Sequence, residues 1–151
     1  MTGPQSCAQE VLDTIPLVMR TIRSEVRQRR QSDLSVPQFR TLAFLYHCSG
    51  ASLSQVAEYV GLTAPSMSKM VEGLVARGFV ARVNSPEDRR RVDLTLAPKG
   101  QAAFLEAREA ARARLAEMLA PLSSIEKTAV VNAMRALREV FAAKENAAQE
   151  K

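Results

Sequence analysis

The sequence predicts a mainly α-helical protein that carries one small β-hairpin. Most apolar residues recur at spacings of three and four, the period of a helix with one buried face. Two short segments, 79–83 and 92–96, have instead the composition of strands, and the second alternates apolar with polar residues. The chain has 151 residues, which suits one compact domain with an appended interaction element.

The first helix is expected from about Ser6 to Arg30. Pro16 interrupts its pattern, so we expect a kink, or a restart that Thr14 caps, rather than one straight rod. Glu25 is the acid that stands among its basic residues, which are Arg20, Arg23, Arg27, Arg29 and Arg30. This basic face could contact nucleic acid or simply be solvated.

Two capping boxes follow. Ser35 with Gln38 opens a second helix, and Ser52 with Gln55 opens a short third one. Gly61 then makes a turn into a fourth helix. Two short helices joined through a glycine predict a helix-turn-helix.

The fourth helix has one apolar and one polar face. Thr63 can cap it, and Pro65 suits its first turn. Its apolar stripe predicts burial of Met67, Met70, Val71 and Leu74. Its other side carries only short polar groups and one cation: Ser66, Ser68, Lys69 and Gly73. Such a helix can approach the edges of bases in a major groove.

The predicted hairpin ends in a cationic turn. Segment 84–91 joins its two strands and contains three consecutive arginines, Arg89, Arg90 and Arg91. A hairpin tipped with arginine beside a helix that fits a groove predicts a winged helix-turn-helix. The alternative is a solvated charge run at a loop tip.

Two long helices complete the chain. Pro98 begins one that reaches about Ala120, and Ser123 with Glu126 caps the last. Their apolar stripes contain Phe104, Ala107, Ala111, Leu115 and Met118, then Ile125, Val130, Met134, Leu137 and Phe141. The small winged core cannot bury both stripes, so we expect them to pair with a second subunit or with each other. The expected regions are therefore 1–34 and 98–151 for dimerisation and 35–97 for DNA binding.

These motifs resemble the MarR family of transcriptional regulators. Asp88-Arg89-Arg90, Leu94-x-Leu96 and Gly100 resemble its wing, whereas Leu53–Ala57 and Gly61-Leu62 resemble its helix-turn-helix. Two positions depart from the family pattern: Ser85, where Asp often precedes the wing proline, and Ala97, where Thr usually caps the next helix. The resemblance implies a homodimer in which the first, fifth and sixth helices of two subunits interlock.

The expected DNA contacts come from the fourth helix and the wing. We expect base contacts from Ser66, Ser68 and Lys69, with Thr63 and Ala64 close to the DNA backbone. The resemblance implies that Arg90 enters a minor groove and that Asp88 fixes it. Further phosphate contacts are expected from Arg89, Arg91, Ser52, Ser54 and Gln55.

The resemblance also implies an effector pocket beside the dimerisation helices, often for aromatic acids or other phenolic compounds. The candidates in that region are Met19, Phe39, Phe44, Tyr46, His47 and Phe104. Ordinary core packing is the commoner explanation for each of them.

The composition of the chain favours some classes of function over others. A net charge of +5 favours an anionic partner. No apolar run has membrane-spanning length and the start lacks a secretory pattern, so a cytoplasmic location is expected. The single histidine and the absence of a glycine-rich phosphate loop argue against an enzyme, a metal site and a cofactor.

The leading hypothesis is a dimeric, sequence-specific repressor that binds a pseudo-palindromic operator and that a small molecule releases. The alternatives are effector-independent DNA binding, a protein-interaction module and a thiol-based redox sensor. Some family members sense hydroperoxides through a first-helix cysteine, and Cys7 lies near that helix start. Cys7 lacks a neighbouring cation, and the dipole at the end of the second helix disfavours a thiolate at Cys48. We expect both to be incidental thiols.

Overall fold

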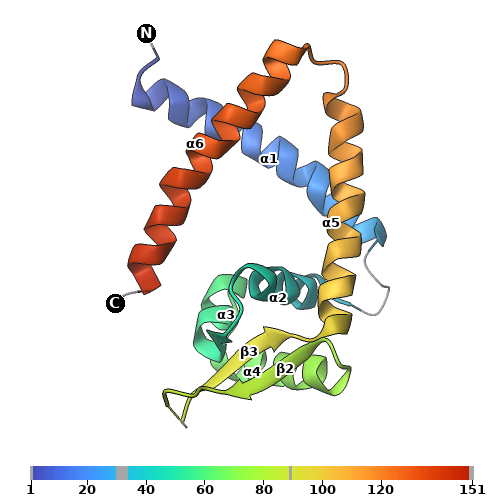
Figure 1. Ribbon diagram of the computed structural model, residues 1–151, viewed down its shortest axis with the longest axis vertical. Helices are drawn as coiled ribbons and strands as arrows, with labels where there is room; N and C mark the ends of the chain where they lie inside the picture. The colour runs from blue at the N-terminus through green and yellow to red at the C-terminus, as the bar shows by residue number, and fades with distance from the viewer. Residues whose placement is uncertain (1, 30–33, 89, 150–151) are drawn as a thin grey trace. The chain divides into compact units, whose positions relative to one another are not determined.

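The structure is a computed structural model that describes residues 2–29, 34–88 and 90–149. The chain divides into two compact units, Met1–Ala113 and Arg114–Lys151. Figure 1 shows the elements in chain order: α1 (Pro4–Arg29), α2 (Val36–His47), β1 (Ala51–Ser52), α3 (Leu53–Val60), α4 (Ala64–Ala76), β2 (Val80–Asn84), β3 (Val92–Leu96), α5 (Pro98–Leu119) and α6 (Ser124–Gln149). The prediction of a mainly helical chain with one hairpin is therefore confirmed.

The first unit contains a winged-helix core. Helices α2, α3 and α4 pack with a three-stranded antiparallel sheet whose strand order is β1-β3-β2. Its buried residues come from every one of these elements and include Leu42, Leu45, Val56, Met67, Val71, Leu74, Phe79 and Leu94. This core holds α4 beside the β2–β3 hairpin (Figure 1).

The sheet has one strand more than the sequence predicted. Strand β1 is only two residues long and pairs Ala51 with Leu94 and Ser52 with Asp93. So short a segment has no alternation to detect, and only its neighbour β3 makes it a strand. The predicted first strand of the hairpin is shifted by one residue, because the main-chain N–H of Phe79 bonds to the carbonyl of Leu74 rather than to β3.

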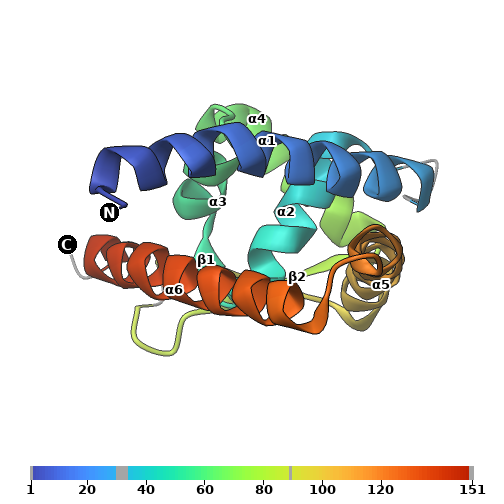
Figure 2. The same ribbon diagram turned by 90° about the horizontal axis from the view of Figure 1, so that it is seen from above.

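Helix α1 continues through Pro16 as one α-helix (Figure 2). The predicted restart capped by Thr14 is therefore wrong. A proline within a helix removes one main-chain hydrogen bond, and here the α-helix continues on both sides of it. Its partly buried Val26 packs against Phe39 and Phe104.

Local caps set the start of each short helix. Ser35 and Gln38 exchange side-chain-to-backbone hydrogen bonds at α2, and Ser52 and Gln55 do so at α3. Both predicted capping boxes are confirmed. Gly61 ends α3 with φ of 81°, a left-handed conformation that glycine adopts without strain. This turn delivers the chain to the start of α4.

The first turn of α5 lies directly against the start of β2. A Cβ atom on Gly100 would come within 2.1 Å of the carbonyl oxygen of Phe79, so only glycine fits there. The Nζ of Lys99 donates to the carbonyl of Arg77 at 3.0 Å and lies over the Phe79 ring. These contacts fix the start of α5 to the end of α4 and to the root of the hairpin.

The second unit holds the last turns of α5 and the helix α6. Ser123 and Glu126 form the predicted capping box, with the Ser123 N–H donating to Glu126 at 2.8 Å. The unit exposes large apolar side chains, including Met118, Ile125, Val131, Met134, Val140 and Phe141. Across the described residues, none of the helices combines the length and the apolar character that a membrane crossing requires.

Candidate nucleic-acid interface

Helix α4 exposes the face that the sequence predicted to be polar. Met67, Val71 and Leu74 are buried and Met70 is half-buried, so the predicted apolar stripe is confirmed. The side chains of Ser66, Ser68 and Lys69 are exposed, as are Thr63 and Ala64 at the start. Helix α4 therefore presents short hydrogen-bonding groups and one cation to solvent.

Thr63 arranges the first turn of this face. Its hydroxyl accepts a hydrogen bond from the Ser66 N–H at 3.3 Å and donates to the Ser66 hydroxyl oxygen at 3.0 Å. The cap therefore satisfies one of the free amides at the start of α4 and orients the Ser66 hydroxyl. Pro65 has no N–H and the Met67 N–H bonds to the Thr63 carbonyl, so the Ala64 N–H is the helix amide in this turn that can donate to a phosphate.

The hairpin tip is held by main-chain hydrogen bonds. The Ser85 N–H donates to the carbonyl of Arg91 at 3.0 Å, and the Arg91 N–H donates to the carbonyl of Asp88 at 3.0 Å. The carboxylate of Asp88 accepts from the main-chain N–H of Arg90 at 2.9 Å. We expected Asp88 to fix the side chain of Arg90, but the contact runs to the backbone. Asp88 thus forms an Asx-turn, since its carboxylate bonds two residues ahead.

The wing arginines differ in their partners. The Nε of Arg91 lies 3.0 Å from the carboxylate of Asp93, on strand β3. The guanidinium of Arg90 is exposed and makes no hydrogen bond or ion pair with any described residue. The prediction for Arg89 concerns a residue outside those described. Of the described wing arginines, Arg90 thus has the freer side chain.

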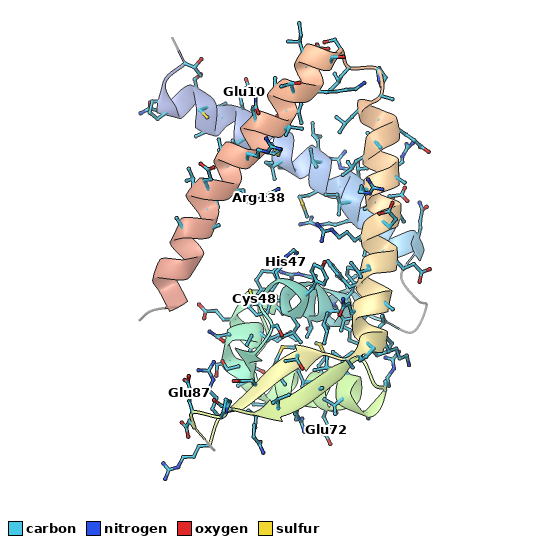
Figure 3. All side chains as sticks on the ribbon, viewed as in Figure 1. Glu10, His47, Cys48, Glu72, Glu87 and Arg138 are labelled. Atoms are coloured by element: carbon cyan, nitrogen blue, oxygen red, sulfur yellow. The ribbon has the colours of Figure 1, made fainter. Side chains whose placement is uncertain are left out.

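Two acidic side chains missing from our sequence-based candidates also lie in this region. Figure 3 shows Glu72 on α4 and Glu87 near the tip of the hairpin, and both are exposed. Glu72 follows Ser68 by one helical turn, so it shares the exposed face of α4. Both could have been recognised from the sequence as charged residues at positions predicted to be exposed. They were not chosen because DNA is anionic and the candidates were cations and short polar groups. A carboxylate can accept a hydrogen bond from the amino group of cytosine.

The three predicted phosphate contacts at α3 have different neighbours. Ser52 and Gln55 accept each other's main-chain N–H in the capping box, at 3.3 and 2.9 Å. Their hydroxyl and amide protons remain available to donate. Ser54 is exposed in the first turn of α3. All three can therefore still donate to an oxygen.

Four predicted pocket residues form one aromatic cluster in the first unit. Phe104 of α5 lies 5.8 Å from Phe39, 4.7 Å from Tyr46 and 6.1 Å from His47, measured between ring centroids. The guanidinium of Arg108 lies 5.6 Å from the centre of the Tyr46 ring. Phe39 and Phe104 are buried, whereas Tyr46 is half-buried and His47 exposed.

The other two residues predicted for the pocket lie apart from this cluster. Phe44 packs on Tyr59 at 4.6 Å, and it adjoins the winged-helix core. Met19 is half-exposed on α1, and the residue of α1 that joins the cluster is Val26. Among the described residues, no three neighbouring His, Cys, Asp or Glu side chains form a group that could hold a metal ion.

A capped polar helix beside a hairpin with arginines at its tip defines a winged helix-turn-helix of the kind that binds duplex DNA. Residues 32–91 match the model of the MarR family. The chain is 31% identical over 126 residues to YfiV, an HTH-type transcriptional regulator of Bacillus subtilis, covering 83% of this chain and 77% of YfiV. The protein belongs to the MarR family of winged helix-turn-helix transcriptional regulators.

Solved structures show the same fold. RV1404 from Mycobacterium tuberculosis superposes with a TM-score of 0.74 at 22% identity, over 91% of this chain and 93% of that one. The transcriptional repressor CouR bound to a 23-mer DNA duplex gives 0.55 at 24% identity, over 89% and 91%. PcaV from Streptomyces coelicolor, in complex with its natural ligand, gives 0.52 at 23% identity, over 91% and 93%.

Proposed function

We propose that the protein is a homodimeric repressor in the cytoplasm that binds a pseudo-palindromic operator and releases it when a small aromatic molecule binds. The observation that carries this proposal is the exposed polar face of α4, held by a buried apolar stripe beside a cationic hairpin. CouR, a transcriptional repressor whose structure is solved on a 23-mer DNA duplex, supports DNA binding and repression in this proposal. Release by a ligand is suggested by PcaV, which binds one.

In this proposal region 35–97 reads the DNA. Ser66, Ser68 and Lys69 contact base edges in the major groove, while Thr63 and Ala64 lie close to the backbone. Arg90 enters the adjacent minor groove, where narrow A·T-rich segments attract arginine. Phosphates are bound by Arg89, Arg91, Ser52, Ser54 and Gln55. The phosphate contacts give affinity, whereas the groove contacts give sequence choice.

Regions 1–34 and 98–151 form the dimer in this proposal. The side chains of Met134 and Phe141 are 43% and 59% exposed, and they share one face of α6 with Val130 and Leu137. An exposed apolar stripe of this size on a helix is usually covered by a partner. A two-fold dimer places two recognition helices about 34 Å apart, one turn of DNA.

The aromatic cluster is the proposed effector site. Phe39, Tyr46, His47 and Phe104 supply ring faces there, and the guanidinium of Arg108 lies beside them. A flat apolar ligand carrying an acidic group matches such a lining, because rings stack on it and a carboxylate pairs with arginine.

The experiment is selection followed by titration. The protein is bound to a pool of random duplexes, and the retained sequences are read and tested individually. We expect an inverted repeat, with much weaker binding to one half-site alone. A library of aromatic acids and phenols is then tested for release of the selected duplex. Retention of DNA without release would favour an effector-independent regulator, and no retention at all would leave the protein-interaction module.

A further inference from the structure

One face of the β2–β3 hairpin packs in the winged-helix core at its root and lines a hollow beside α4 farther out. Val80 pairs with Leu96, Arg82 with Leu94 and Asn84 with Val92, so these six side chains share one face of the hairpin. At the root this face is core, since Val80 and Leu94 are 2% exposed. Toward the tip it leaves the core, and Arg82, Asn84 and Val92 are exposed.

A hollow of about 340 Å³ lies where the hairpin leaves the core. Ser68 and Val71 of α4 form one wall, and Arg82, Val92 and Leu94 of the hairpin form the other, with Leu53 of α3 between them. The lining residues are apolar apart from Ser68 and Arg82, which brings a guanidinium to this region. That guanidinium has no hydrogen bond or ion pair with any described residue, so it is available to a ligand.

The location of the hollow determines what it can hold on DNA. The major and minor grooves of a duplex are separated by one sugar–phosphate strand. When α4 occupies the major groove and the hairpin tip occupies the adjacent minor groove, that strand must cross the space between them. The hollow lies in this space, between Ser68 and the face of the hairpin that carries Arg82.

We propose that this hollow receives the sugar–phosphate strand that separates the two grooves and that Arg82 binds its phosphate. The inference rests on the proposed DNA binding and adds a contact that the recognition helix and wing tip do not make. A guanidinium suits a phosphate because it donates two parallel hydrogen bonds. The apolar side chains of Val92 and Leu53 suit the deoxyribose. Arg82 thereby sets the spacing between the helix and the wing on the duplex.

A phosphate contact and a base contact differ in their effects. Loss of a phosphate contact weakens binding to all sequences alike, and it lowers the slope of log affinity against log salt concentration by about 1. Loss of a base contact instead relaxes sequence preference. Arg82→Gln should therefore lower the salt slope by about 1 and leave the affinity ratio between selected and scrambled duplexes unchanged. Arg82→Lys, which keeps the charge, should retain most of the slope.

The matched control is Arg112→Gln. It removes the same charge from α5, where the Arg112 guanidinium pairs with Glu109 at 2.7 Å. The 151-residue chain and all variants are titrated by fluorescence anisotropy against a duplex selected from the random pool, over a series of salt concentrations. We expect Arg112→Gln to keep the wild-type slope. Thermal unfolding of each variant verifies that Arg82→Gln remains folded, since its side chain is exposed.

A second measurement locates the contact. Uncharged methylphosphonates are introduced into the selected duplex one linkage at a time. One linkage should weaken wild-type binding but leave Arg82→Gln binding unaffected. The inference would be overturned if Arg82→Gln kept the wild-type salt slope. It would also be overturned if every methylphosphonate weakened duplex binding by Arg82→Gln as much as it weakens binding by the wild type. If the wild-type protein retains no duplex, the proposed DNA-binding function itself fails and this inference fails with it.

Discussion

The carboxylate of Asp88 accepts a hydrogen bond from the main-chain N–H of Arg90, at 2.9 Å, and leaves the guanidinium of Arg90 free of described partners. Asp88 therefore shapes the turn at the wing tip rather than neutralising its arginine. The carbonyl of the same residue accepts from the Arg91 N–H. One residue thus organises the backbone of the tip through two acceptors, and Arg90 keeps its full charge for a partner.

This relationship predicts different effects of two substitutions at Asp88. Asp88→Ala removes the side-chain acceptor, so the turn loosens and duplex affinity should fall by about 0.5–1.5 kcal/mol, the usual worth of one hydrogen bond. Asp88→Asn keeps an acceptor oxygen and should bind like wild type. Anisotropy titration against the selected duplex measures both. If Asp88→Asn loses as much affinity as Asp88→Ala, the negative charge matters and the Asx-turn explanation is wrong.

Arg90 should contribute sequence preference as well as affinity. Arg90→Ala is expected to weaken binding to the selected duplex by roughly 1–3 kcal/mol and to relax the preference for A·T pairs beneath the wing. Arg91→Ala is the comparison, since its guanidinium lies at Asp93 and is expected to act only on phosphates. It should weaken selected and scrambled duplexes equally. Equal binding by Arg90→Ala and wild type would refute the minor-groove assignment.

The apolar stripe of α6 predicts how the dimer can be broken. Phe141→Glu places a carboxylate in the proposed interface, and burial of an unpaired charge should raise the dissociation constant of the dimer by about a hundredfold or more. Asn132→Glu adds the same group to the opposite face of α6 and should leave assembly intact. Sedimentation velocity at micromolar concentration distinguishes them. A folded monomer of the wild-type chain would contradict the proposed dimer and its two half-sites.

The capping box of α6 predicts a dependence on pH. Hydrogen bonds from the main chain and side chain of Ser123 lower the pKa of Glu126 from its ordinary value of 4.5. The pKa of Glu126 is lower in the folded protein than in the unfolded chain, so its carboxylate stabilises the folded state above pH 4.5. This stabilisation of the fold is lost as the pH falls through the folded-state pKa. An NMR titration of the Glu126 carboxyl should show a midpoint below 4.5. Ser123→Ala keeps the main-chain N–H that donates to Glu126 and removes only the hydroxyl, so the midpoint should rise part of the way toward 4.5. A midpoint that does not rise would show that the hydroxyl hydrogen bond does not lower the pKa of Glu126.

Cys7 should have no regulatory effect. It is an exposed thiol in the first turns of α1, and its sequence neighbours carry no cation. Cys7→Ser should bind the selected duplex like wild type, and mild peroxide should leave wild-type binding unchanged. Peroxide-induced release that a thiol reductant reverses and that Cys7→Ser abolishes would instead establish a redox sensor.

Local sequence patterns were enough to predict the caps of α2, α3, α4 and α6 and the presence of each helix. Each capping box joins residues three apart, as in Ser35 with Gln38, so its geometry depends only on the local chain. The buried stripe of α4 was likewise visible, because helical spacing places Met67, Val71 and Leu74 on one face. The wing arginines could be recognised because they stand in the short connection between two strand-like segments.

Tertiary structure alone decided the contacts between distant segments. The pairing of Ala51 with Leu94 creates β1, and the convergence of Ser68, Arg82 and Val92 creates the hollow. At the wing, the resemblance to the family implied that Asp88 fixes the side chain of Arg90, whereas in the folded turn the Asp88 carboxylate accepts from the main-chain N–H of Arg90. Periodicity reports which face of an element is buried, but a hydrogen bond or a hollow requires the positions of several elements at once. Only packing of the core around Phe79 and Leu94 sets those positions.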